Sequence, residues 1–309
     1  MEPPPYDDSQ QSRPSAPPPP PPANPDFQPQ IGASQQQPQQ PAAPQIVIVN
    51  TGGAGPPPGP APLPAVQGPD ITLKLQELDI PYEMYKDLIE CAGTDIVVIA
   101  DDSGSMRNYA QPGLTRWQEL QQTLTRLIDI LLAVDHTDGF HITFLSQIKF
   151  FNIRSPEQVH QLFQTHGPRG GTPLQAALQA SFSGMWNPKP YPPQDVILLV
   201  MTDGEPSDCT LDMMARLIQG RPQNYFCSFL MCTGEDDIVE KYNRVIDPIW
   251  GCDISDDYES ERKEVRRATG KDLSRNQWLT KCVLGGKFVK YDRMDEGRTG
   301  GGDKCCTVQ

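Results

Sequence analysis

Oxygen-bearing side chains occupy alternate positions directly after a short apolar segment, residues 96–100. They are Asp101, Ser103 and Ser105, and carboxylate and hydroxyl oxygens are the ligands that a hard divalent cation prefers. Short Asp/Ser patterns also cap helices, so these three residues alone are weak grounds for a metal site. A metal site would need further oxygen ligands from other parts of the chain.

Two downstream segments supply such oxygens. Residues 170–174 have the sequence Gly-Gly-Thr-Pro-Leu, and an apolar run at 196–202 is followed by Asp203. Apolar, β-branched runs that do not alternate are typical of strands buried on both faces. Ligands bind at the carboxyl ends of the strands in an open α/β sheet, so Asp101 and Asp203 are expected to lie at one such edge.

In order and position, these three segments resemble the metal-ion-dependent adhesion site of the von Willebrand factor type A domain family, which includes the integrin inserted domains. The resemblance implies that the two serines coordinate Mg²⁺ or Mn²⁺, that the threonine joins them when ligand is bound, and that the two aspartates act directly or through water. The alternative is a vestigial domain whose loops are held by hydrogen bonds alone. The implied metal ligands are Asp101, Ser103, Ser105, Thr172 and Asp203.

Helical and strand patterns alternate through the same region, which indicates βαβ units and a mostly parallel sheet. The predicted fold class is therefore α/β, a doubly wound sheet flanked by helices. Residues 253–259 are expected to form a charged, solvated loop. The predicted strands are 96–100, 140–145, 148–151, 196–202 and 226–231. The predicted helices begin near residues 81, 114, 156, 174, 212, 235, 260 and 274.

The first 70 residues differ sharply in composition from the rest. Most of the 34 prolines lie there, with many Gln, Ala, Gly and Ser residues. Such a segment cannot bury enough apolar surface to offset its conformational entropy, so a disordered tail is predicted. Pro3, Pro4 and Tyr6 match the P-P-x-Y ligand of WW domains, with plain linker composition as the alternative. The net charge of −13 disfavours nucleic acid or a bare anionic membrane as the main partner.

The last residues suggest attachment to a membrane. Cys306 is the fourth residue from the end of the given sequence and fits the C-a-a-X pattern with a terminal Gln, which is usually farnesylated. One lipid gives only weak association, so Cys305 is predicted as an S-acylated second anchor. Acidic residues offset the basic ones in this tail. Without a secretory or membrane-spanning pattern, the expected location is cytoplasmic and peripheral to a membrane, with reduced cysteines.

The predicted function is divalent-metal-dependent protein binding, in which an acidic side chain of a partner protein completes the coordination of the ion, without enzymatic activity. One alternative is a hydrolytic enzyme that uses the same ion, with Asp102, Glu205 or Asp208 as an available carboxylate. Another is a scaffold that acts through the proline-rich tail. The expected parts are a tail at 1–70, a leading helix and linker at 71–92, the domain at 93–290 and a flexible tail at 291–309.

Overall fold

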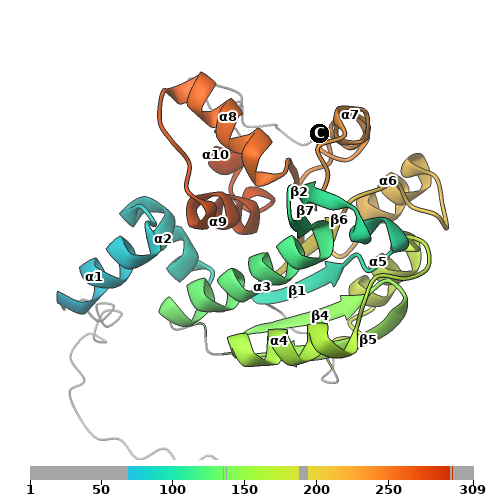
Figure 1. The fold of residues 1–309 in the computed structure, drawn as a ribbon, viewed down its shortest axis with the longest axis horizontal. Coiled ribbons are helices and arrows are strands. Elements are labelled where there is room, and N and C mark those ends of the chain that lie inside the picture. The colour runs from blue at the N-terminus through green and yellow to red at the C-terminus, as the bar shows by residue number, and fades with distance from the viewer. Residues whose placement is uncertain (1–68, 135, 137, 188–193, 293, 295–309) are drawn as a thin grey trace, which may run out of the picture. The chain divides into compact units, whose positions relative to one another are not determined.

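The structure is a computed structural model that describes residues 69–134, 136, 138–187, 194–292 and 294 (Figure 1). Four predictions made from the sequence lie wholly or almost wholly outside these residues. They are the disordered tail at 1–70, the WW-domain ligand at Pro3, Pro4 and Tyr6, the flexible tail at 291–309, and the lipidation of Cys305 and Cys306.

A six-stranded sheet organises the described domain. Its strands are β1 (Asp95–Ala100), β4 (Phe140–Phe144), β5 (Gln147–Ile153), β6 (Val196–Thr202), β7 (Tyr225–Met231) and β8 (Cys252–Ser255). Across the sheet the order is β5-β4-β1-β6-β7-β8, and only the β4–β5 pair is antiparallel. The prediction of a doubly wound, mostly parallel α/β sheet is confirmed. The strand order reverses between β1 and β6, which makes their carboxyl ends the expected place for a ligand.

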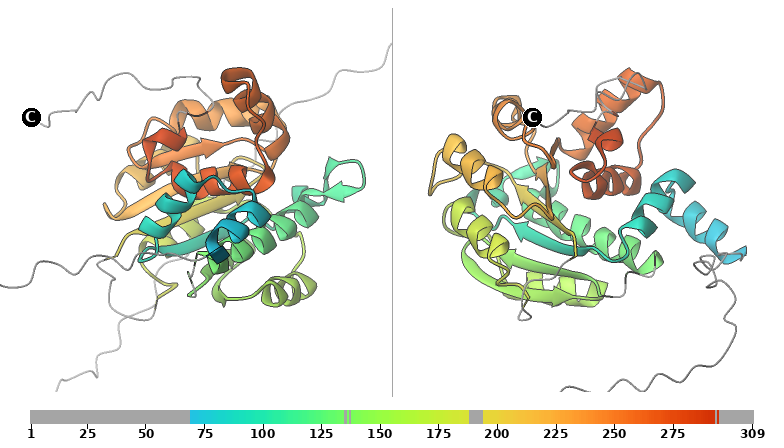
Figure 2. Two further views of the ribbon diagram at one scale, coloured as in Figure 1. Left: turned by 90° about the vertical axis from the view of Figure 1, so that its left-hand side faces the viewer. Right: turned by 180° about the vertical axis from the view of Figure 1, so that it is seen from behind.

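Helices cover both faces of the sheet, which explains why the central strands are apolar throughout (Figures 1 and 2). Successive residues of a strand point to opposite faces, and β1 shows this directly. Ile96, Val98 and Ala100 pack on one face, whereas Val97 and Ile99 pack on the other. The first face is covered by α3 (Arg116–Ala133), α4 (Pro156–Thr165) and α9 (Arg275–Gly285). The second is covered by α5 (Leu174–Phe182), α6 (Leu211–Gln219) and α7 (Asp236–Val245).

The remaining elements are short. A two-stranded hairpin follows the Asp101 turn and projects away from the sheet (Figure 2); its strands are too short to show a period-two pattern in the sequence. None of the described helices has the length and hydropathy needed to cross a membrane. These elements are α1 (Pro69–Leu78), α2 (Tyr82–Glu90), a 3₁₀ helix (Gly104–Arg107), β2 (Tyr109–Gln111), β3 (Leu114–Thr115), α8 (Tyr258–Thr269) and α10 (Val289–Asp292).

The prediction of a solvated loop at residues 253–259 is wrong. The edge strand β8 occupies its start, and Asp253 is only 1% exposed. The Ser255 hydroxyl donates a hydrogen bond of 3.1 Å to the Asp253 carboxylate. A Cβ at Gly285 would lie 2.3 Å from Asp253 Oδ2, so the absence of a side chain there lets α9 cover the strand. The acidic and hydroxyl residues of this segment give no indication in the sequence that a helix packs over it.

The six described cysteines are free thiols. Cys227 and Cys252 are register partners on the parallel strands β7 and β8, yet they form no disulfide. Burial raises the pKa of Cys227 well above its ordinary value, so this thiol is poorly reactive. The six are Cys91, Cys209, Cys227, Cys232, Cys252 and Cys282.

A buried ion pair fixes the orientation of α8 on α9. Lys281 Nζ lies 2.9 Å from Glu261 Oε1, and the two side chains are 0% and 1% exposed. Tyr258 and Val265 are buried on the same face of α8 as Glu261. Breaking a buried pair by removing one partner typically costs about 3–5 kcal/mol, so rotation of α8 about its axis is strongly disfavoured.

Asp256, just before α8, is expected to make the stability of the domain depend on pH. Burial, together with the nearby carboxylates of Glu264 and Glu261, raises the pKa of Asp256 to about 7. Because this pKa is higher in the folded than in the unfolded chain, where it is about 4, protonation of Asp256 favours folding. Its stabilising contribution is complete below about pH 4 and is lost as the pH rises through about 7.

We therefore expect Asp256→Asn to raise the free energy of unfolding at alkaline pH by on the order of 2 kcal/mol, a figure reduced for solvent screening of a partly buried group. At acidic pH the same change should have little effect. Urea titrations of both proteins at the two extremes measure this. The exposed Asp236→Asn on α7 is the control and should change little at either pH. If Asp256→Asn raised the free energy of unfolding equally at acidic and at alkaline pH, the raised pKa of Asp256 would not be the cause.

Candidate metal-binding site

The predicted metal ligands lie at the edge of the sheet where the strand order reverses. Ala100 and Met201 are register partners near the carboxyl ends of β1 and β6. The Asp101 N–H donates a hydrogen bond of 2.8 Å to the Met201 carbonyl, which continues the pairing beyond the strand. The parallel register therefore brings the turns that hold Asp101 and Asp203 next to each other, as expected from the sequence.

Asp101 lies at the base of the site and is completely buried. Its carboxylate accepts hydrogen bonds from the Ser103 N–H at 2.7 Å and from the Thr202 hydroxyl at 2.6 Å. Burial raises the pKa of Asp101 above its ordinary value, although these hydrogen bonds oppose the effect. A buried carboxylate whose charged form is disfavoured is stabilised by a nearby positive charge, such as a bound cation.

A chain of hydroxyl groups connects the two aspartate turns. The Ser103 and Ser105 hydroxyl oxygens are 2.9 Å apart, and the Ser105 hydroxyl donates a hydrogen bond of 2.8 Å to Asp203 Oδ1. Ser103 and Asp203 are buried, whereas Ser105 lies at the surface. Four of the five predicted ligands, including Asp101, thus form one continuous set of contacts.

The loop that holds Thr172 is fastened to both aspartate turns. The Gly104 N–H donates to the Gly170 carbonyl at 3.1 Å, and the Thr172 N–H donates to the Ser207 hydroxyl at 3.0 Å. Gly170 has φ +74°, and a Cβ at Gly171 would lie 3.1 Å from the Ser207 hydroxyl, so both glycines serve this close approach. Within the described chain, the Thr172 side chain makes no hydrogen bond to the other four predicted ligands.

Arg116 belongs to the site and was not predicted from the sequence. Its guanidinium donates to Asp203 Oδ2 at 2.8 Å and also, at 3.1 Å each, to the Thr233 hydroxyl and the Glu235 carboxylate. Burial alone would lower the pKa of Arg116, but the bonds to Asp203 and Glu235 raise it above its ordinary value. The only local indication of its position is the Thr115 capping box, which makes Arg116 the first residue of α3.

Three carboxylates near the site are already hydrogen-bonded to the chain. Asp102 accepts hydrogen bonds from the backbone and side chain of Ser146, and Asp208 accepts from two N–H groups in the first turn of α5. Glu205 pairs with Lys241 at 2.5 Å. None of the three contacts the serine hydroxyls between the aspartate turns.

The donor set of the site suits a hard divalent cation. It combines two carboxylates with serine hydroxyls, and Mg²⁺ and Mn²⁺ prefer such oxygen ligands. Across the described ranges, no cluster of three or more His, Cys, Asp or Glu side chains could hold a metal. The serine hydroxyls and the Asp203 carboxylate lie in contact at the ends of β1 and β6.

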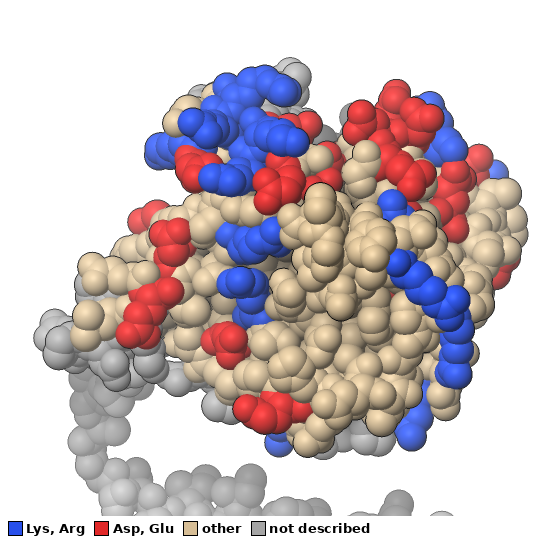
Figure 3. All heavy atoms as spheres, in the orientation of Figure 1, with Lys and Arg blue, Asp and Glu red and all other residues tan. Residues whose placement is uncertain are grey.

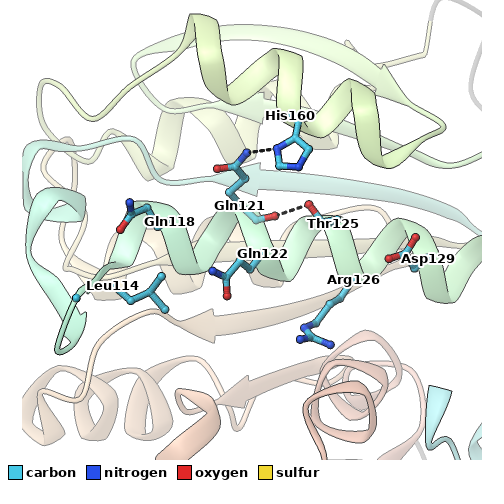
Figure 4. Close-up of a pocket in the computed structure, with 9 residues that line it drawn as sticks. Leu114, Gln118, Gln121, Gln122, Thr125, Arg126, Asp129 and His160 are labelled. Atoms are coloured by element: carbon cyan, nitrogen blue, oxygen red, sulfur yellow. Dashed lines mark hydrogen bonds between the residues drawn. The ribbon is translucent and has the colours of Figure 1, made fainter. Parts of the chain in front are cut away.

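A separate polar groove of about 560 Å³ runs along α3 and past His160 of α4 (Figure 4). The Gln121 amide lies 2.7 Å from His160 Nδ1 at its wall. None of the predicted metal ligands lines this groove, so it is a different surface from the metal site. Its lining also includes Gly113, Leu114, Gln118, Gln122, Thr125, Arg126 and Asp129.

Comparisons with protein-family models and with curated protein sequences find no match for this chain. Among solved structures, the manganese-loaded TRAP protein of Plasmodium vivax is similar, with 18% identity, a TM-score of 0.35, and coverage of 55% of this chain and 71% of that chain. A von Willebrand factor type A structure from Catenulispora acidiphila has 18% identity and a TM-score of 0.38, covering 62% of this chain and 43% of that one.

An aerotolerance-related membrane protein from Bacteroides fragilis is also similar, with 15% identity, a TM-score of 0.33, and coverage of 45% of this chain and 67% of that chain. At such identities and scores, these similarities establish nothing about the function of this chain. The fold is instead defined by its strand order, with the candidate metal ligands at the reversal between β1 and β6.

Proposed function

We propose that this chain is a divalent-metal-dependent protein-binding module, in which Mg²⁺ or Mn²⁺ takes a carboxylate of a partner protein as a ligand. The observation that carries the proposal is the continuous contact from Asp101 through Ser103 and Ser105 to Asp203, at the sheet edge where the strand order reverses. These residues, with Thr172, would hold the ion.

The charges of the buried groups favour an acidic partner. Asp101 and Asp203 carry two negative charges and Arg116 carries one positive charge, so these three groups sum to about −1 when both carboxylates are ionised, apart from Asp102, whose carboxylate binds Ser146. A divalent cation changes this to about +1. A carboxylate that approaches from the side of exposed Ser105 would then be attracted to the ion and would neutralise the site.

The contacts of the neighbouring carboxylates favour this function over a hydrolytic enzyme. A general base must be within reach of the water or substrate whose proton it removes. Asp102, Asp208 and Glu205 are each engaged by other groups of the chain. These contacts orient the three carboxylates toward groups of the chain and account for their positions without a catalytic role.

The proposal is tested by capture of protein partners from a cell lysate in Mg²⁺ and in chelator. Ser105→Ala is expected to reduce metal-dependent capture by at least about 10-fold, because it removes one oxygen ligand. The free energy of unfolding should change by less than about 0.5 kcal/mol, since Ser105 is exposed. The matched control is Ser183→Ala, an exposed serine that follows α5. Capture that is equal with and without chelator would contradict the proposal.

The pattern at Cys305 and Cys306 supports, from sequence alone, a lipid anchor to a cytosolic membrane face as a second part of the proposed function. Cell fractionation should find the wild type enriched in membranes, Cys305→Ser weakly associated and Cys306→Ser soluble, because two signals are needed for stable anchoring. Membrane enrichment of Cys306→Ser equal to that of the wild type would rule out this anchor.

The alternative that partners bind the proline-rich tail is tested by deleting residues 1–70 and measuring the recovery of partner proteins.

A further inference from the structure

The C-terminal half of α8 presents a basic surface. Lys263, Arg266, Arg267 and Lys271 are all exposed, and we call this set the α8 basic face. Figure 3 shows basic side chains gathered over α8. Within the described chain, none of the four forms an ion pair. Their charges are therefore available to a partner.

The packing of α8 keeps these residues pointing outward. Tyr258, Glu261 and Val265 recur at spacings of three and four and form the buried face of the helix. The buried pair between Glu261 and Lys281 holds this face against α9. The outward direction of the basic side chains is thus fixed by the fold and needs no ligand to create it.

Two of the neighbouring acidic residues are engaged elsewhere, whereas Glu264 lies on α8 itself and leaves the four basic residues in excess there. Asp272 binds the fifth cation of this region, Arg262, through two hydrogen bonds of 2.7 Å. Asp257 accepts hydrogen bonds from the first N–H groups of α8, at the opposite end of the helix. The chain as a whole is acidic, with a net charge of −13, but exposed charges more than about 10 Å apart are largely screened at about 0.1 M salt. The α8 basic face can therefore act locally.

We infer that the α8 basic face binds the surface of an anionic lipid membrane. Clusters of four or more Lys and Arg on one face of a helix are attracted to phosphatidylserine, at about 1 kcal/mol per basic residue near the surface, or about five-fold in affinity. The four residues lie on one helix and the turn after it, so a flat charged surface can meet them together.

The choice of a membrane over other anionic partners rests on the lipid anchor of the proposed function and on the position of α8 near the end of the described chain. Helices α8 and α10 both pack against α9, and Met294, just after α10, packs against the same core. The segment with Cys305 and Cys306 follows Met294 in the sequence. The sequence near the two cysteines has no run of basic residues. The α8 basic face, from another segment of the chain, would supply the positive charge that this tail lacks.

Sedimentation with lipid vesicles tests this inference on the full-length chain expressed without lipid modification and in chelator. The outcome is then independent of both the metal site and the anchor. The wild type should bind vesicles of phosphatidylcholine with about 30% phosphatidylserine, but not pure phosphatidylcholine, at about 0.1 M salt. Changing the α8 basic face to glutamine (Lys263→Gln, Arg266→Gln, Arg267→Gln and Lys271→Gln) should reduce the partition coefficient by at least about 50-fold.

The control changes the net charge equally but at exposed positions on other elements. It combines Lys149→Gln, Arg154→Gln, Arg216→Gln and Arg244→Gln and should keep binding within about three-fold of the wild type. Glutamine has a helix propensity close to those of Lys and Arg, so α8 should still form, which circular dichroism and the urea midpoint verify.

Three outcomes would overturn the inference. The first is a wild type that fails to bind the phosphatidylserine vesicles. The second is an equal loss of binding in both four-residue variants, which would show that only net charge matters. The third is binding to poly-glutamate or duplex DNA through the α8 basic face when the same vesicles are not bound, which would assign this surface to another class of partner.

Discussion

Replacing Asp101 by asparagine is expected to weaken the binding of Mg²⁺ or Mn²⁺ by at least about 100-fold while leaving the domain folded. The change removes one of the two buried negative charges that would balance the ion, and metal affinity depends strongly on ligand charge. The asparagine can keep the hydrogen bond from the Ser103 N–H. The Thr202 hydroxyl, which now donates to Asp101, also has the Gly204 carbonyl at 3.4 Å as a second acceptor. Isothermal titration calorimetry measures the metal affinity.

Asp102→Asn is the matched control, because Asp102 is the next residue and is equally buried. Its carboxylate binds Ser146 and takes no part in the contacts between Ser103, Ser105 and Asp203. This variant should lose some stability but keep its metal affinity within about 10-fold of the wild type. Loss of metal binding in Asp102→Asn together with normal binding in Asp101→Asn would show that the ligand set is wrong.

Replacing Arg116 by methionine is expected to lower the free energy of unfolding in chelator by about 3 kcal/mol and, at the same time, to increase metal affinity by about 10-fold. The change leaves Asp203 buried without its cation, which is costly in the absence of metal. It also removes the positive charge that would repel the ion. Addition of Mn²⁺ should therefore stabilise Arg116→Met more than it stabilises the wild type.

Thermal unfolding with and without Mn²⁺ measures both effects in one series. The control is Arg275→Met, which removes two more exposed ion pairs, of 3.2 Å to Glu119 and 3.6 Å to Glu259, and a stacking contact with Tyr258. It should cost about 1 kcal/mol or less and leave the response to metal unchanged. A lower metal affinity in Arg116→Met would show that Arg116 organises the ligands rather than opposing the charge of the ion.

The framework of the site could be predicted from the order and composition of short segments. The apolar runs that became β1 and β6 do not alternate because both faces of these strands are covered, and this property is visible in a few consecutive residues. Parallel strands end at a common edge, so the positions of Asp101, Ser103, Ser105 and Asp203 followed from the ends of two runs. These residues come directly after two strands that are neighbours in the sheet. Local sequence patterns were therefore sufficient to predict that they lie close together.

Which charged side chains pair with each other could not be predicted from the sequence and follows from the fold. Arg116 and Asp203 are 87 positions apart in the sequence. Arg116 begins α3 and Asp203 follows β6, and no periodicity or spacing in the sequence indicates that these two places meet. Asp253 shows the same limit, because an acidic segment resembles a solvated loop until α9 is seen to cover it. The outward direction of the α8 basic face depends on the pair between Glu261 and Lys281. Pairing and burial of charges depend on distances between segments that are remote in the chain, and a linear sequence does not contain those distances.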